Sequence, residues 1–200
     1  MTDDIFQTGD HETELSVEEK LALIPSLSTR AELNQAERLN IHAARVWVMR
    51  PRALRDPELL TDTFARELHR RMFNRVWRWA GRYRSTEKNL GWEVHRLNEG
   101  VSNAFRDAQA WIEHGTYPLT EIAVRLHHRL VAIHPWPNGN GRHARLMADI
   151  LIASRDGAGL SWGARDELDA ISEVRARYLA ALRCADAGDF APLVAFAGPK

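Results

Sequence analysis

The apolar residues of this chain recur every three or four positions in several separate stretches, which is the spacing of one face of an α-helix. The clearest stretch has apolar side chains at Leu60, Phe64, Leu68, Met72 and Val76. Glycine and proline residues separate such stretches from one another. Because helical spacing dominates the chain, the sequence predicts an all-α fold.

Helical spacing continues along the chain with one interruption. The stretch nearest the N-terminus has helical spacing at Leu33, Ala36, Leu39 or Asn40, Ala43, and Val46 or Trp47. The later stretches begin at Val101, Ile122, Leu146 and Leu168. Residues 82–98 break the period, and residues 89–94 are typical of a short extended segment or hairpin. The expected architecture is therefore a helical bundle with one small β-hairpin.

Polarity and helical pattern divide the chain into three parts. Residues 1–27 are polar and predict an extended arm lying over the body. Residues 28–50 predict a first helix, because Thr29 and Glu32 have the spacing of a capping box just before the apolar stripe. Residues 51–200 hold the remaining helices. A chain of 200 residues suits one domain with a sizeable core.

The charge balance and the cysteine count exclude several classes of protein. Lysine and arginine total 27, and aspartate and glutamate also total 27, so no net charge attracts nucleic acid or an anionic membrane. The single cysteine, Cys184, excludes an intramolecular disulfide and argues against a thiolate zinc site. The N-terminus lacks an apolar signal segment, and the apolar runs are too short to span a bilayer. We expect a cytoplasmic protein without nucleic-acid or membrane partners.

Groups that handle phosphates are concentrated in the motif HPWPNGNGRHAR, which begins at His134. His134 is a candidate general base, because a histidine can accept a proton near neutral pH. Gly139 and Gly141 allow turns whose N–H groups point into a shared concavity, which binds anions. A helix that begins beside them adds its dipole to that attraction. Arg142 and Arg145, three residues apart, would project from one face of this helix.

This motif resembles the signature of the Fic-domain family, HxFx(D/E)GNGRxxR. The matching positions are His134, Gly139, Asn140, Gly141, Arg142 and Arg145. Trp136 replaces one aromatic residue by another and should anchor the loop in the core. Asn138 stands where the family has an acidic residue that holds magnesium, and a neutral amide oxygen lacks the charge that hard cations favour. The PNGNGR form, together with residues 29–34, resembles the Fic subgroup called mobile mystery protein B.

The resemblance implies a Fic-type helical fold and the activity of a protein adenylyltransferase. Such an enzyme moves AMP from ATP to a Ser, Thr or Tyr hydroxyl of a target protein and releases pyrophosphate. His134 would take the proton of that hydroxyl. Glycine at position 141, where Doc-type relatives have lysine, favours AMP transfer over phosphorylation.

The same resemblance assigns the nucleotide contacts. The backbone of residues 139–141, together with Asn140, would hold the α-phosphate of ATP. Arg142 would bind the β-phosphate and Arg145 the γ-phosphate. Asn138 would take what remains of the Mg²⁺ role. ATP and magnesium are therefore the expected substrate and cofactor.

Two further regions are implied to act on this site. Leu90 and Trp92 lie where the family has a flap that clamps the target chain beside the catalytic histidine. Many Fic proteins also carry an inhibitory helix whose glutamate pairs with the second arginine of the signature. Glu32 matches part of that pattern, which predicts a pair with Arg145 in the resting state. Inhibition by a separate antitoxin, as in toxin-like members of the family, is the other form of control that the resemblance implies. A capping box alone would also explain why a glutamate stands at position 32.

Other functions fit the same residues. A regulator that binds nucleotide or target without turnover would suit the missing acidic ligand at Asn138. A hydrolase that removes AMP from a modified protein would use the same pocket. His127, His128 and His143 lie close to the motif in sequence. Adjacent helical residues point about 100° apart, so packing roles are favoured over a zinc site.

Overall fold

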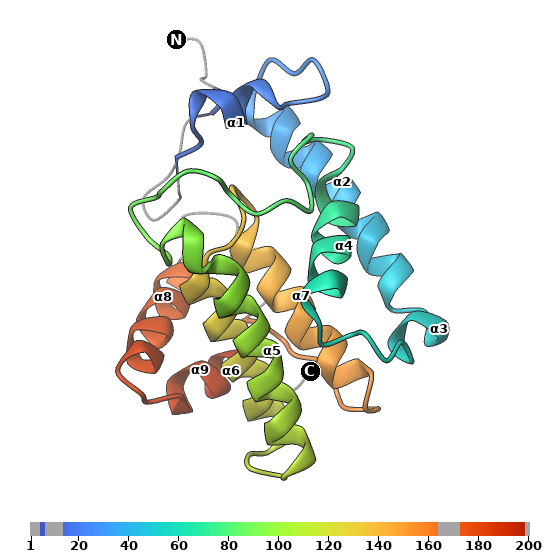
Figure 1. Ribbon diagram of the computed structural model, residues 1–200, viewed down its shortest axis with the longest axis vertical. Coiled ribbons are helices and arrows are strands. Elements are labelled where there is room, and N and C mark those ends of the chain that lie inside the picture. Colours follow the sequence, from blue (N-terminus) through green and yellow to red (C-terminus); the bar gives the residue numbers. More distant parts are fainter. Residues whose placement is uncertain (1–4, 7–13, 164–172, 199–200) are drawn as a thin grey trace.

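The computed structural model describes residues 5–6, 14–163 and 173–198, and it confirms the all-α prediction (Figure 1). The longer helices are α2 (Arg30–Val48), α4 (Asp62–Phe73), α5 (Leu97–Glu113), α6 (Leu119–Ile133), α7 (Asn140–Ala153) and α8 (Glu173–Asp186). The shorter ones are α1 (Val17–Leu21), α3 (Pro51–Leu54) and α9 (Ala191–Ala197), with a 3-10 turn at Val94–Arg96. Within the described part of the chain, every helix is too short or too polar to traverse a lipid bilayer.

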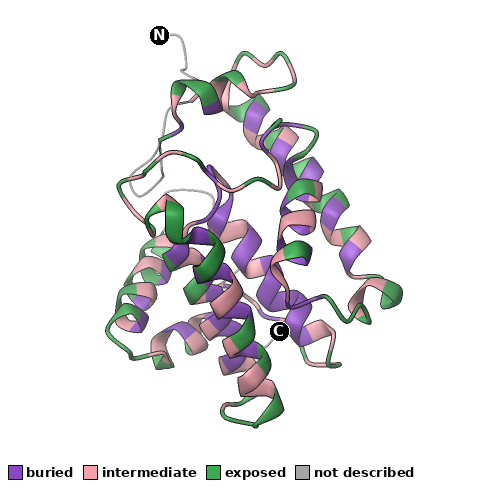
Figure 2. Cartoon of the chain, viewed as in Figure 1, coloured by how far each residue is buried: buried purple, intermediate pink, exposed green. Residues whose placement is uncertain are grey.

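Helix α7 lies at the centre of the packing. It contacts α6 on one side and α4 on the other, while α5 packs against α6 and α2 lies along α4 (Figure 1). Helices α8 and α9 pack against each other, and α9 contacts α6. Most residues of α7 are buried, whereas the outer helices bury one face only (Figure 2). The N-terminus of α7, where the motif lies, is therefore held by helices from several parts of the chain.

The inward face of α2 differs from the predicted one. Its buried residues are Leu33, Glu37, Asn40, Ala44 and Val48. Two apolar residues of the predicted stripe, Leu39 and Val46, are instead 65% and 49% exposed. The buried face is rotated by about one residue; it includes Asn40, the predicted alternative to Leu39, and also Glu37. Both have polar partners inside the fold, so their burial costs little.

The described part of the N-terminal arm packs on the turn that follows α4. Backbone hydrogen bonds join residues 22–24 to residues 76–78, with one antiparallel bridge between Leu23 and Trp77. Glu19 of α1 forms an ion pair with Lys88, with 2.6 Å between Oε2 and Nζ. Parts of two predictions lie outside the described residues, namely 1–4 and 7–13 of the arm and Leu168 of the last helix.

The predicted β-hairpin is wrong for the described residues, because residues 82–93 form a loop without strand pairing. The backbone donors of this loop bind the connection between α6 and α7. Arg84 N donates to Pro135 O at 2.9 Å, and Trp92 N donates to Ile133 O at 3.1 Å. Since these bonds satisfy the loop from a neighbouring segment, its two halves do not need to pair with each other.

Candidate active site

Helix α6 ends at Ile133, and its C-cap, His134, has a left-handed backbone with φ 53°. Histidine is among the non-glycine residues that are enriched in this conformation. The His134 carbonyl accepts a hydrogen bond from Nε of the buried Arg84 at 2.8 Å, and the same guanidinium binds the carbonyls of Thr86 and Trp92. A Cβ on Gly91 would lie 2.6 Å from the His134 Cβ. The loop 82–93 is thus fixed directly beside the histidine.

The His134 imidazole is neutral at physiological pH. Burial lowers the pKa of His134 to about 4, and the positive charges of Arg84 and Lys88 act in the same direction. An uncharged imidazole can accept a proton, as a general base must. A bound polyanion would raise this pKa toward neutrality and so strengthen the base.

The two residues predicted for target binding lie in the same loop. Trp92 is partly buried, with its ring packed close to Gly100 and the Arg96 guanidinium 4.8 Å from the ring centroid. Leu90 is half-buried two residues earlier. Both positions are close in sequence to Gly91, which touches His134. Their place in the fold is compatible with a role in target binding.

Asn140 closes the loop between α6 and α7. Its Oδ1 accepts a hydrogen bond from Trp136 N at 2.9 Å, and its Nδ2 donates to Trp136 O at 2.8 Å. The Trp136 ring is buried and stacks on His69 with 4.0 Å between centroids, so it anchors the loop as predicted. The predicted phosphate role of the Asn140 side chain needs correction, because both of its polar atoms already bind Trp136.

The N-terminus of helix α7 has the backbone geometry of an anion-binding site. Its N-cap is Gly139, which has φ 83° and provides no side-chain hydrogen bond to the first turn. A Cβ at this position would lie 2.3 Å from the Phe73 ring, so glycine alone fits. The first N–H groups of a helix have no partner within the helix, and the dipole adds positive charge there. This end of α7 can therefore bind a phosphate.

Arg142 projects from the first turn of α7 into a buried polar cluster that the sequence did not predict. Its Nη1 lies 2.6 Å from Oε2 of Glu37, a residue of α2 that is 2% exposed. The other carboxylate oxygen, Oε1, accepts from Trp77 Nε1 at 2.7 Å and from Asn138 Nδ2 at 3.1 Å. The Glu37 carboxylate therefore already occupies a guanidinium expected to bind phosphate.

Arg145 lies one turn farther along α7, close to Gly141. Its Nη1 is 3.5 Å from the place where a Cβ on Gly141 would stand. Its guanidinium carbon is 5.8 Å from the ring centroid of Tyr178, a residue of α8. Both motif arginines thus follow the glycines within the first two turns of α7, and His134 caps the preceding helix, α6.

Glu32 does not take part in this site. Its Oε2 accepts hydrogen bonds from the backbone N–H groups of Ser28 at 2.7 Å and Thr29 at 3.1 Å. The Thr29 hydroxyl in turn accepts from Glu32 N, which completes a capping box. The predicted pair with Arg145 is not among the contacts that the structure describes for Glu32. The α2 glutamate that reaches the motif is Glu37.

The arrangement does not fit a magnesium ion held by the protein. Asn138 Oδ1 accepts from Gly139 N at 2.7 Å and lies 3.4 Å from Arg142 Nη2, while its Nδ2 faces Glu37. The adjacent carboxylate is paired with Arg142. In the described ranges, no group of three His, Cys, Asp or Glu side chains could hold a metal. Both polar atoms of Asn138 are thus bound to protein groups, which does not suit the predicted magnesium role.

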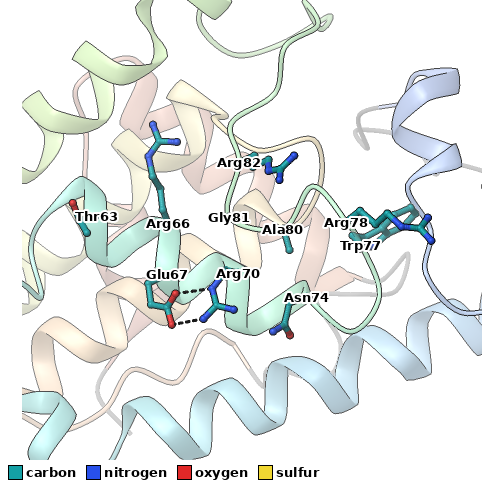
Figure 3. A pocket seen from close by; sticks show the side chains of 10 residues that line it. All are labelled: Thr63, Arg66, Glu67, Arg70, Asn74, Trp77, Arg78, Ala80, Gly81 and Arg82. Carbon is teal, nitrogen blue, oxygen red and sulfur yellow. Dashed lines mark hydrogen bonds and ion pairs between the residues drawn. The ribbon is translucent and has the colours of Figure 1, made fainter.

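An open pocket with a volume of about 530 Å³ lies between α4 and the turn that follows it. Its basic lining residues are Arg66, Arg70, Arg78 and Arg82, whose guanidinium groups point in different directions (Figure 3). Arg70 is paired with Glu67. His69 links this region to the motif, because its Nδ1 accepts from Gly81 N at 3.0 Å and its Nε2 lies 3.1 Å from Asn138 O. None of the residues that line this pocket belongs to the motif.

Residues 59–152, which include the motif, match the model of the Fic/DOC family. This stretch of the chain is therefore a Fic/DOC-family domain. Among curated proteins, protein adenylyltransferase fic-1 of Caenorhabditis elegans is 34% identical over 134 residues, covering 65% of this chain and 25% of that protein. Protein adenylyltransferase Fic of Nematostella vectensis is 36% identical over 90 residues, covering 43% and 21%. The chain thus spans a quarter or less of the length of these relatives.

Solved structures agree on the fold. Fic-1 from C. elegans superposes with a TM-score of 0.65 at 24% identity, covering 90% of this chain and 52% of that one. The BepC protein of Bartonella tribocorum, solved with bound AMPPNP, gives a TM-score of 0.65 at 15% identity, covering 92% and 100%. At these identities the superpositions establish a shared Fic fold.

Proposed function

We propose that this protein is a protein adenylyltransferase that transfers AMP from ATP to a hydroxyl side chain of a target protein. The observation that carries the proposal is the neutral His134, which immediately precedes the anion-binding end of α7 with Arg142 and Arg145. A proton acceptor and two cations at a helix N-terminus suit attack on a polyphosphate. The curated relatives named as adenylyltransferases support the same reaction.

The reaction follows from this geometry. The hydroxyl oxygen of a target Ser, Thr or Tyr attacks the α-phosphorus, and His134 takes the hydroxyl proton. The bond from the α-phosphorus to the bridging oxygen breaks, and pyrophosphate leaves. The backbone N–H groups of residues 139–141 stabilise the charge that grows on the α-phosphate. Arg142 and Arg145 hold the β- and γ-phosphates, and the loop 82–93, with Leu90 and Trp92, holds the target chain.

Isotope placement tests this proposal. The purified protein is incubated with magnesium ATP labelled at the α- or the γ-phosphate, alone and with a cell lysate as the source of target. We expect protein-bound label from α-labelled ATP only. Label from γ-labelled ATP would indicate phosphoryl transfer and overturn the proposal. Nucleotide binding without any label would favour a regulator, and release of AMP from a modified protein would favour a hydrolase.

We also propose that Glu37, in place of Glu32, inhibits the enzyme in the resting state. Arg142 cannot bind Glu37 at 2.6 Å and a β-phosphate with the same guanidinium edge. The neutral Asn138 supports this role, because it donates a hydrogen bond to Glu37 at 3.1 Å. An acidic residue at position 138 would face that carboxylate with like charge. A separate antitoxin, the mobile mystery protein B subgroup and a cytoplasmic location stay predictions.

Replacing Glu37 by glutamine should release this inhibition. Glu37→Gln removes the charge that holds Arg142 but keeps an oxygen that can accept from Trp77. A hydrogen bond to a charged group contributes about 1.5–3 kcal/mol, so ATP affinity and self-labelling should rise about tenfold or more. Calorimetric titration with ATP measures the affinity. Glu32→Gln is the matched control and should leave ATP affinity unchanged, whereas the reverse outcome would restore the Glu32 hypothesis.

A further inference from the structure

We propose that Glu19 of α1 and Lys88 of the loop 82–93 are positioning residues that hold this loop in the conformation that receives the target chain. The inference rests on the proposed function, because it assumes that the loop binds a target beside His134. Helix α1 lies outside residues 59–152, which match the family model. The loop is therefore supported by a part of the chain that the matched stretch does not include.

The Glu19 carboxylate is bound to the middle of the loop. Its Oε2 lies 2.6 Å from Lys88 Nζ, and the two side chains are only 9% and 5% exposed. Its Oε1 accepts a hydrogen bond from Thr86 Oγ1 at 3.0 Å. Lys88 Nζ also donates to the Glu14 carbonyl at 2.8 Å. Two loop residues thus bind the N-terminal segment, and the ion pair among these contacts is shielded from water.

The first turn of α1 fixes the direction of the Glu19 side chain. The N-cap, Ser16, donates its N–H to Glu19 Oε2 at 2.7 Å, and its hydroxyl accepts from Glu19 N at 3.2 Å. The Glu19 carbonyl accepts from Trp79 Nε1 at 3.2 Å. Burial alone would raise the pKa of Glu19, but the hydrogen bonds from Lys88 and Ser16 and the charge of Lys88 lower it below its usual value. The carboxylate is therefore charged at neutral pH and held toward the loop.

The same contacts reach the backbone of His134. Thr86 directs its hydroxyl to Glu19, and its carbonyl accepts from Arg84 Nη1 at 2.9 Å. Arg84 Nε donates in turn to the His134 carbonyl at 2.8 Å. Hydrogen bonds therefore join α1 to the proposed base through two residues of the loop.

The attachment to α1 restrains the middle of the loop, whereas its ends are held elsewhere. Arg84 N and Trp92 N bind the α6–α7 connection. Leu90 lies between Lys88 and Trp92 in sequence and is half-buried. A segment with fewer buried contacts opens more often, so loss of the ion pair should loosen the residues between the two ends. A target chain would then have to order the loop as it binds, which weakens binding.

Replacing Glu19 by glutamine tests the attachment directly. Glutamine removes the charge and still suits a capping box, so α1 should form as before. Because Lys88 then lacks its counter-charge, the amide hydrogens of Arg84 and Trp92 should exchange with solvent about tenfold faster. Hydrogen exchange followed by NMR in the full chain measures these rates. Glu18→Gln is the matched control, because it makes the same charge change on the exposed side of α1.

The second measurement is the transfer of AMP to protein. Each variant receives magnesium ATP labelled at the α-phosphate and a cell lysate as the source of target, and calorimetric titration measures ATP affinity separately. Glu19→Gln should lower the labelling of lysate protein about tenfold without lowering ATP affinity, because the loop holds the target and the N-terminus of α7 holds the nucleotide. A purely structural role would lower labelling, ATP affinity and the melting temperature together, and would overturn the inference.

A milder variant covers the case in which Glu19→Gln does not fold. Thr86→Val removes the hydroxyl that donates to Glu19 and leaves the ion pair with Lys88 in place. A neutral donor contributes less than a charged one, so both exchange and labelling should change about threefold in the same directions. A folded Thr86→Val protein with wild-type exchange and wild-type labelling would contradict the attachment.

The outcomes separate this inference from the function on which it rests. If the wild type labels no protein, the proposed transfer fails and this inference fails with it. If the wild type labels protein and Glu19→Gln matches it in exchange and in labelling, only the role of Glu19 and Lys88 is overturned. Faster exchange without a loss of labelling, or the reverse, also overturns that role. Both changes together, absent from Glu18→Gln, support it.

Discussion

Replacing His134 by asparagine is expected to lower the rate of adenylyl transfer about 10²–10⁴-fold, which is the usual contribution of a general base. Asparagine suits this position because it tolerates the left-handed backbone that His134 adopts at φ 53°. Its amide cannot accept the hydroxyl proton at neutral pH. The variant should therefore fold and bind ATP as the wild type does while the transfer rate falls by this factor.

The pH dependence of transfer gives the same prediction a second readout. The reactive form of His134 is the neutral one, and its pKa is about 4. The value of kcat/KM should therefore be flat between about pH 5.5 and 8 and fall only as the pH approaches 4. An acid limb near pH 6.5 would contradict a buried, neutral base. The bound polyphosphate raises this pKa, so the limb in kcat should lie at higher pH than the limb in kcat/KM.

A matched histidine shows whether the loss is specific. His128 lies on the same helix, α6, and its ring binds Asp186 at 2.7 Å rather than any motif residue. His128→Asn should retain the transfer rate within about twofold. Equal losses in the two variants, measured from incorporation of α-labelled ATP, would show that His134 has no special part in the chemistry.

The anion-binding end of α7 could be predicted because the residues that create it are adjacent in the chain. The glycines set the local backbone, and Arg142 and Arg145 follow at helical spacing. Geometry of this kind depends on neighbours within one turn. The fold class was predictable for a similar reason, since the period of apolar residues reports helices without any knowledge of their partners.

The inner face of α2 could not be predicted from hydrophobicity. Its buried stripe includes Glu37 and Asn40, while Leu39 and Val46 are largely exposed. Burial of the two polar residues is favourable only because their partners lie far away in sequence, with 105 positions between Glu37 and Arg142. A pattern that scores apolar residues assigns such a face to solvent. A glutamate at the spacing of buried neighbours was the available signal.

The loop beside His134 was mispredicted for a related reason. Residues 89–94 have the composition of a hairpin, and strand pairing is the local way to satisfy such a backbone. The structure satisfies it through the buried guanidinium of Arg84 and through carbonyls of the α6–α7 connection. Arg84 is not part of any recognisable sequence motif, so its contacts with the α6–α7 connection could not be predicted from the sequence. The loop 82–93 is thus attached to the segment that carries His134.

The free energy of unfolding is expected to fall steeply as the pH drops from about 6.5 toward 4. Burial is the largest cause of a lowered pKa in His69, His127, His134 and His143. The unfolded chain has the ordinary histidine pKa of about 6.5, so it binds more protons than the folded protein below that pH. Stability from these groups is therefore complete above about pH 6.5 and is lost as the pH falls toward the folded values.

The expected effect is a large part of the stability of a typical domain. A histidine whose pKa falls from 6.5 to about 4, as for His134 and His143, contributes about 2 kcal/mol less stability at pH 5 than at pH 7.5. The two groups together contribute about 4 kcal/mol less at pH 5, a large part of the 5–15 kcal/mol that typically holds a domain together, and His69 and His127 act in the same direction. Urea denaturation followed by circular dichroism at pH 7.5, 6 and 5 measures the loss.

One variant tests whether the buried histidines cause the loss. His143 Nε2 lies 3.0 Å from the Ala65 carbonyl, and the amide of a glutamine can donate the same bond without titrating. His143→Gln should therefore lose about 2 kcal/mol less than the wild type between pH 7.5 and 5. His42→Gln, on the exposed face of α2, is the control and should follow the wild type. Parallel curves for all three proteins would mean that acid acts through other groups.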